Sequence, residues 1–80
     1  MNNNRIAFAG ASLKKIRNDK NLTQGELADR CSFDPSYISL LENDVKSPKL
    51  KTIFTLAAGL EMKAFELVRE IEESIGLLLD

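Results

Sequence analysis

The residues best suited to chemistry in this chain are small polar and basic side chains in its central part. Serines at 36 and 39 and a tyrosine at 37 are followed by Lys46 and Lys49. The chain has no His, and Cys31 is its only cysteine. This composition excludes a disulfide framework within the chain, the common zinc patterns and His-based catalysis. We therefore expect a binding protein that is not an enzyme, with no catalytic residue, no metal and no cofactor.

Charge is distributed unevenly along the 80 residues, although the net charge is only −1. Residues 1–60 contain nine Lys or Arg against six Asp or Glu, whereas residues 61–80 contain two against six. An average can hide a basic face, so the distribution is consistent with a DNA-facing body and a separate acidic segment. The first five residues carry no long apolar stretch, and we expect a cytoplasmic protein without a membrane segment.

Apolar periodicity predicts an all-α fold in which residues 1–80 form a single domain of five helices. The first helix is expected over residues 5–19, with Ile6, Ala9, Leu13 and Ile16 on one stripe. The second should begin after Thr23, which with Glu26 forms a capping box, and run to about residue 30.

The third helix is expected to begin after Asp34, with Pro35 at its first position. A loop over residues 43–49 follows. The fourth helix is expected over residues 50–60, where the apolar residues that should close the core are Leu50, Ile53, Leu56, Ala57 and Leu60.

The last segment, residues 63–79, has apolar residues spaced four, three, four and three apart, which is typical of two helices packed together. Eighty residues bury a small core, so such a chain gains by pairing with a second copy. We therefore expect a dimerisation helix, although the segment could instead fold back on its own domain. The predicted interface residues are Ala64, Phe65, Val68, Ile71, Ile75 and Leu78.

Three stretches together resemble the phage-repressor (Cro/CI, XRE-type) helix-turn-helix family. They are residues 22–28, residues 36–43 (Ser-Tyr-Ile-Ser-Leu-Leu-Glu-Asn) and residues 47–52 (Ser-Pro-Lys-Leu-Lys-Thr). The resemblance covers roughly residues 5–67, and the short restriction–modification controller proteins look nearest. It implies a repressor-like helix-turn-helix at about residues 23–43. It also implies a sequence-specific regulator of transcription that binds a pseudo-palindromic double-stranded DNA operator as a homodimer. We expect no small-molecule ligand, because a single domain of this size leaves no second domain to house a ligand pocket.

The resemblance also implies roles for single residues. Arg17 and Glu42 match a pair that forms a buried salt bridge in some members. Gln24, Asn43, Lys46 and Lys49 match positions that hold DNA phosphates. The surface that enters the major groove corresponds to Pro35, Ser36, Tyr37, Ser39 and Leu40.

The chain departs from the family at several positions. No Arg, Lys, Gln or Asn lies between Asp34 and Glu42, so we expect weaker direct readout and more dependence on DNA shape. Glu61 stands where the family usually has Gly and should be a mildly strained cap. Tyr37 could instead lie flat on the protein, and the lysines could be merely solvated. The apolar Leu40 leaves open a protein-interaction module, such as an antitoxin.

Overall fold

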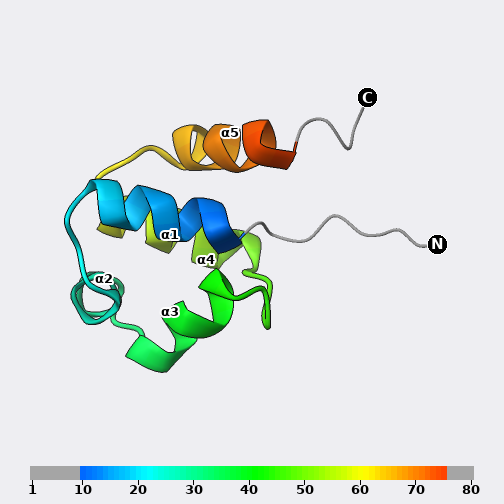
Figure 1. Ribbon diagram of the computed structural model, residues 1–80. Coiled ribbons are helices and arrows are strands. Elements are labelled where there is room, and N and C mark those ends of the chain that lie inside the picture. Colours follow the sequence, from blue (N-terminus) through cyan, green and yellow to red (C-terminus); the bar gives the residue numbers. More distant parts are fainter. Residues whose placement is uncertain (1–9, 76–80) are drawn as a thin grey trace.

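The computed structural model describes residues 10–75, which form five α-helices and no strand (Figure 1). The expected start of the first helix, residues 5–9, lies outside the described residues. Within residues 10–75, none of the helices has the length and apolar character needed to cross a membrane. The all-α, five-helix prediction is confirmed, with α1 at Gly10–Asp19, α2 at Gln24–Cys31, α3 at Pro35–Glu42, α4 at Leu50–Gly59 and α5 at Ala64–Ile75.

Local capping explains why the helices begin where they do. The Thr23 hydroxyl accepts from the Glu26 amide at 3.0 Å, and the Glu26 carboxylate accepts from the Thr23 amide at 2.8 Å. Asp34 caps α3, and Pro35 occupies its first turn. Glu61 has φ 58°, a left-handed conformation that is unfavourable for a residue with a Cβ. The capping box, the proline start and the strained position at 61 are therefore as predicted.

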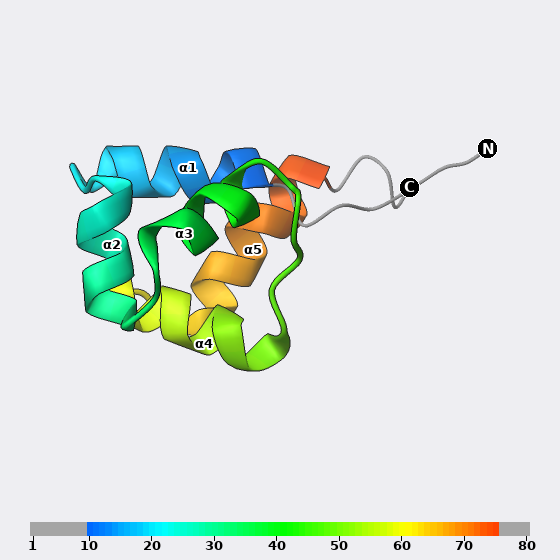
Figure 2. The same cartoon turned by 90° about the horizontal axis from the view of Figure 1, so that it is seen from below.

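The core consists mainly of leucine and isoleucine. The largest fully buried side chains are Leu13, Leu27, Ile38, Leu41, Leu56, Leu60 and Leu67, so every helix contributes at least one. Leu50 was predicted to join this core, and that prediction is wrong, since its side chain is 70% exposed. Leu50 is the first residue of α4, and this turn lies at the edge of the molecule (Figure 2), where the other helices do not cover it.

The packing of the helices leaves α3 and α5 on opposite sides of the bundle (Figure 1). α3 packs against α1 and α2, whereas α5 packs against α1 and α4. The outer face of α5 is therefore not the outer face of α3, and a partner could cover one without the other.

Candidate nucleic-acid interface

The turn between α2 and α3, residues 32–34, is closed by backbone hydrogen bonds. Ser32 adopts a left-handed conformation with φ 58°, and its N–H donates to the Asp29 carbonyl at 3.2 Å. The Phe33 N–H then donates to the Ala28 carbonyl at 2.8 Å. These bonds satisfy carbonyls at the end of α2 and redirect the chain into α3. The result is two short helices joined by a tight turn, a helix-turn-helix.

The two sides of α3 differ in exposure. Ile38, Leu41 and Glu42 are buried. Of the residues predicted to read bases, Pro35 and Ser36 are exposed, whereas Tyr37, Ser39 and Leu40 are half-buried. The predicted groove-facing residues thus share one outer side of the helix, and its N-terminal end is the most open part.

Tyr37 has a reason for its partial burial. Its ring packs edge-on against Phe33, with centroids 5.1 Å apart and an angle of 86° between the planes. Such an edge-to-face pair is favourable for aromatic rings. One side of Tyr37 therefore packs on Phe33, edge-on and not flat. Only the rest of the side chain can contribute to an external surface.

The polar side chains on the outer side of α3 are already hydrogen-bonded to one another. Asp34 Oδ1 accepts from the Ser36 N–H at 2.9 Å and from Ser36 Oγ at 2.8 Å. These bonds, the backbone one first and the hydroxyl one second, lower the pKa of the Asp34 carboxyl. At the other end of the helix, Asn43 Nδ2 donates to the Ser39 carbonyl at 2.9 Å and to Ser39 Oγ at 3.3 Å.

Gln24, a predicted phosphate ligand, is half-buried at the start of α2. Its Nε2 donates to Glu42 Oε1 at 3.0 Å. A primary amide carries two hydrogens on this nitrogen, so the bond to Glu42 uses one and leaves the second. The contact orients the amide from inside the protein, a feature that the sequence did not reveal.

Arg17 and Glu42 form a buried ion pair between α1 and α3. Arg17 Nε lies 2.6 Å from Glu42 Oε2, and Nη2 donates to Oε1 at 3.1 Å. Arg17 Nη1 also donates to the Leu22 carbonyl at 2.6 Å. Arg17 therefore joins α1, α3 and the connection between α1 and α2, which is a structural role.

The loop after α3, residues 43–49, places Asn43, Lys46 and Lys49 at the surface, all exposed. Its start is anchored, because Asp44 Oδ1 accepts from the Gly10 N–H at 2.8 Å. Asp44 itself has φ 58°. This link joins residues 34 positions apart, and no local sequence pattern predicts such a long-range contact.

The predicted interface on α5 needs correction. Ile71 is only 7% exposed and belongs to the core of its own domain, and Ala64 and Ile75 pack against that core. The reason is that α5 lies on α1 and α4, so part of the apolar face expected to meet a second copy is used within the chain. Leu78 lies outside the described residues.

Other apolar side chains on α4 and α5 are exposed to solvent. Phe65 and Val68 on α5 are 63% and 43% exposed, and Leu50 and Phe54 on α4 are 70% and 59% exposed. These four side chains lie on two helices that pack against each other, and none of them is on α3.

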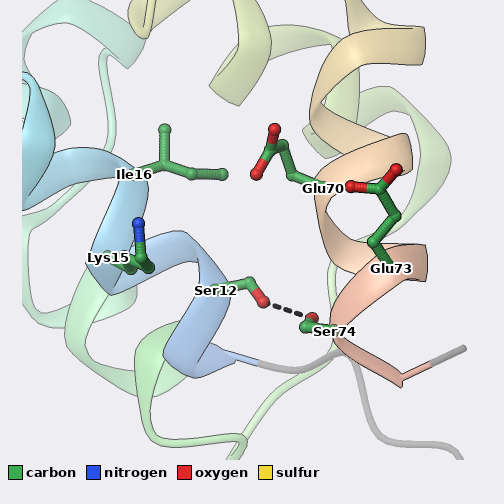
Figure 3. A pocket seen from close by; sticks show the side chains of 6 residues that line it. All are labelled: Ser12, Lys15, Ile16, Glu70, Glu73 and Ser74. Atoms are coloured by element: carbon green, nitrogen blue, oxygen red, sulfur yellow. Dashed lines mark hydrogen bonds between the residues drawn. The ribbon is translucent and has the colours of Figure 1, made fainter. Parts of the chain in front are cut away.

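A hollow of about 290 Å³ lies between α1 and α5 (Figure 3). Glu70 and Glu73 of α5 and Lys15 of α1 line it, and the hydroxyls of Ser12 and Ser74 are hydrogen-bonded at its edge. Its two carboxylates are unsuited to a polyanion. The hollow is therefore not part of the candidate interface.

The chain matches a family model described as helix-turn-helix over residues 13–67, a span that includes α2, α3 and α4. The protein belongs to the XRE-type helix-turn-helix family. Members of this family are DNA-binding regulators of transcription, and it is not a family of enzymes. The family expected from the sequence is thus confirmed.

Relatives and solved structures agree with this membership. The chain is 34% identical over 67 residues to the uncharacterized HTH-type transcriptional regulator y4dJ of Sinorhizobium fredii, covering 84% of this chain and 87% of the relative. The clp gene regulator ClgR from C. glutamicum has a TM-score of 0.78 with 28% identity, covering 86% of this chain and 90% of ClgR.

A restriction–modification controller protein is also similar. C.Esp1396I, crystallised as a tetramer in complex with its natural 35-base-pair operator, has a TM-score of 0.70 and 33% identity. The match covers 81% of this chain and 91% of the controller protein. Controller proteins are therefore among its structural neighbours, as the sequence suggested.

Proposed function

We propose that this protein is a transcriptional regulator that binds a specific double-stranded DNA operator as a homodimer. The observation that carries the proposal is the open outer side of α3, which lies directly before a loop that exposes Lys46 and Lys49. A helix for the major groove beside cations for the phosphates is the arrangement that helix-turn-helix recognition requires. The similarity to C.Esp1396I, which was crystallised on its operator, supports the proposal. Such a regulator would act in the cytoplasm.

The proposed contacts divide into two classes. Gln24, at the N-terminus of α2, and Asn43, Lys46 and Lys49 hold phosphates and set the position of α3. Base edges and DNA shape are then read by Pro35, Ser36, Tyr37, Ser39 and Leu40. Because none of these residues is Arg, Lys, Asn or Gln, bidentate base contacts are few and groove shape contributes much of the selectivity.

The proposed dimer forms through α5 and α4. Phe65 and Val68 form its centre, and Leu50 and Phe54 extend the apolar area that a second copy covers. These residues lie on helices other than α3, so we expect pairing to leave both recognition helices open. A two-fold dimer on a pseudo-palindrome needs these helices about 34 Å apart, in successive major grooves.

Selection from a pool of randomised duplexes, followed by salt titration of the recovered sequences, tests the proposal. We expect a pseudo-palindromic consensus and an affinity that falls steeply with salt, because phosphate contacts release counterions. Recovery of no consensus, together with binding that does not respond to salt, would remove the regulator proposal. A protein-docking role for α3 has less support than the sequence suggested, since Leu40 is half-buried.

A further inference from the structure

Three hydrogen-bond donors in the first turn of α3, two from Ser36 and one from the Tyr37 backbone, are used inside the protein. Pro35 has no backbone N–H to offer. The Ser36 N–H and hydroxyl both donate to Asp34 Oδ1, at 2.9 and 2.8 Å, and the Tyr37 N–H donates to the Asp34 carbonyl at 2.9 Å. The backbone N–H groups of Ser36 and Tyr37 and the Ser36 hydroxyl are therefore already used within the protein.

The ionisation of Asp34 fixes the direction of the hydroxyl bond. Its pKa is lowered, first by the Ser36 backbone N–H and second by the Ser36 hydroxyl, so the side chain is a carboxylate at neutral pH. A carboxylate only accepts hydrogen bonds, and a serine hydroxyl has one hydrogen. The Ser36 hydroxyl donates its hydrogen to Asp34 Oδ1. Ser36 Oγ and Asp34 Oδ2 are therefore left only with lone pairs, which accept hydrogen bonds. Both residues are exposed.

Bases differ in what they present to such a surface in the major groove. Cytosine and adenine present exocyclic amines, at N4 and N6, which donate hydrogen bonds. Guanine presents N7 and O6, and thymine presents O4, all of which accept. Two acceptors that face an acceptor leave both sides unpaired, which is costly once water is excluded.

Building on the proposed function, we propose that Asp34 and Ser36 form an acceptor-only pair that selects a base with an exocyclic amine, cytosine or adenine, opposite the N-terminus of α3. The same pair disfavours guanine or thymine on that strand. Arg and Lys read guanine by donating hydrogen bonds to it, whereas this pair accepts hydrogen bonds from the base. α3 contains neither Arg nor Lys. Asp34 and Ser36 thus become specificity-determining residues, although Asp34 was interpreted from the sequence only as a helix cap.

The substitution Asp34→Asn tests whether residue 34 acts as an acceptor toward the base, with little change in the fold. Asn caps helices about as well as Asp, so α3 is retained, while the new amide adds hydrogen-bond donors. Asp29→Asn is the matched control, because it makes the same chemical change at an exposed position of α2. In selection from randomised duplexes, we expect wild type and Asp29→Asn to enrich cytosine or adenine at one position of each half-site. Asp34→Asn should lose that preference.

Removal of single amines from the selected operator gives a second, direct readout. Each cytosine is replaced by 2-pyrimidinone, or each adenine by purine, one position at a time. We expect wild type to lose about tenfold in affinity at one position of the half-site, within the usual range for a base contact. Asp34→Asn should lose little there, because its amide puts hydrogen-bond donors where the carboxylate had only acceptors. Ser36→Ala, which keeps the Asp34 carboxylate, should lose less than wild type. Comparison between variants cancels the effect of each analogue on the duplex itself.

The outcomes separate this inference from the proposed function. A consensus with salt-sensitive binding but no amine-dependent position would overturn the acceptor pair and leave the regulator proposal intact. The acceptor pair is likewise overturned if guanine or thymine is enriched at that position on the contacted strand, or if Ser36→Ala and Asp34→Asn lose as much as wild type when the amine is removed. Loss of consensus and of salt-sensitive binding in wild type would instead remove the proposed function. Circular dichroism melts of each variant verify that it is folded.

Discussion

Glu42 accepts two hydrogen bonds from the guanidinium of Arg17, at 2.6 and 3.1 Å, and both side chains are withdrawn from water. Their exposed fractions are 8% for Arg17 and 2% for Glu42. The same carboxylate also accepts from Gln24. One buried charge pair therefore connects α1, the start of α2 and the end of α3, which are the elements that orient the helix-turn-helix.

Removing one partner of this pair should destabilise the fold strongly. We expect Glu42→Ala to lower the free energy of unfolding by about 3–5 kcal/mol, because it leaves a buried guanidinium without its counter-charge. Arg17→Met combined with Glu42→Leu should recover most of the loss. Urea unfolding measures both. The exposed pair of Lys15 and Asp19 serves as control, and Asp19→Ala should change little. A small effect of Glu42→Ala would show that the pair does not hold the helices together.

Replacement of two glycines, Gly10 and Gly25, by alanine should change the stability of the protein in opposite directions. A Cβ on Gly10 would lie 2.2 Å from the Leu41 carbonyl oxygen and 2.4 Å from that of Glu42, so Gly10→Ala must displace α1 from α3. We expect a loss of about 1–3 kcal/mol, typical of overpacking. A Cβ on Gly25 would meet only Thr23 Oγ1 at 3.9 Å, and Gly25→Ala should stabilise α2 by about 0.5–1 kcal/mol. The changes in stability are measured by thermal melts. If both variants are stabilised, or both destabilised, the close approach of Gly10 to the backbone of α3 is contradicted.

Sedimentation of a charge variant on α5 tests the dimer. Phe65→Asp places a carboxylate in the proposed interface, yet Phe65 is 63% exposed in the single chain, so folding should persist while the dimer dissociates. Asn18→Asp adds the same charge on the exposed side of α1 and should leave the dimer unchanged. Ile71→Asp is unsuitable, because Ile71 lies in the core and its exchange should unfold the protein. An undisturbed Phe65→Asp dimer would show that the interface lies elsewhere.

Removal of the two loop lysines should weaken binding to all DNA sequences by a similar factor. Lys46→Ala combined with Lys49→Ala removes two phosphate contacts, so the slope of log affinity against log salt should become shallower by about two. The paired control is Lys14→Ala with Lys63→Ala, which removes the same charge from exposed positions outside the loop. Filter binding to specific and random duplexes at several salt concentrations gives the slopes. Equal slopes for the two double variants would show that the loop does not face the DNA backbone.

Features specified by neighbouring residues were predictable from the sequence. The Thr23–Glu26 capping box and the Asp34–Pro35 helix start depend on residues within one turn, and both are present. Positive φ at residue 61 was also expected, from a Gly-to-Glu difference at a helix end.

Features that depend on how helices meet were not predictable in the same way. Periodicity showed that α5 has an apolar face, but it could not distinguish the face used against α1 and α4 from the face left for a partner. Ile71 was therefore predicted in the interface, and it lies in the core. Leu50 was predicted in the core and is exposed, because periodicity does not show where neighbouring helices end. The bonds from Gln24 to Glu42 and from Gly10 to Asp44 join distant segments and leave no local pattern.

The anchoring of residues 44–46 has a thermodynamic consequence for ligand capture. Asp44 is fastened to the first turn of α1, and the N–H groups of Val45 and Lys46 both donate to the Leu40 carbonyl, at 2.9 and 3.2 Å. The segment that leads to the lysines is thus ordered before any duplex arrives. Ordering a loose segment on association costs conformational entropy, and for residues 44–46 part of that cost has been met during folding. More of the attraction between the lysines and a polyanion therefore remains as net affinity.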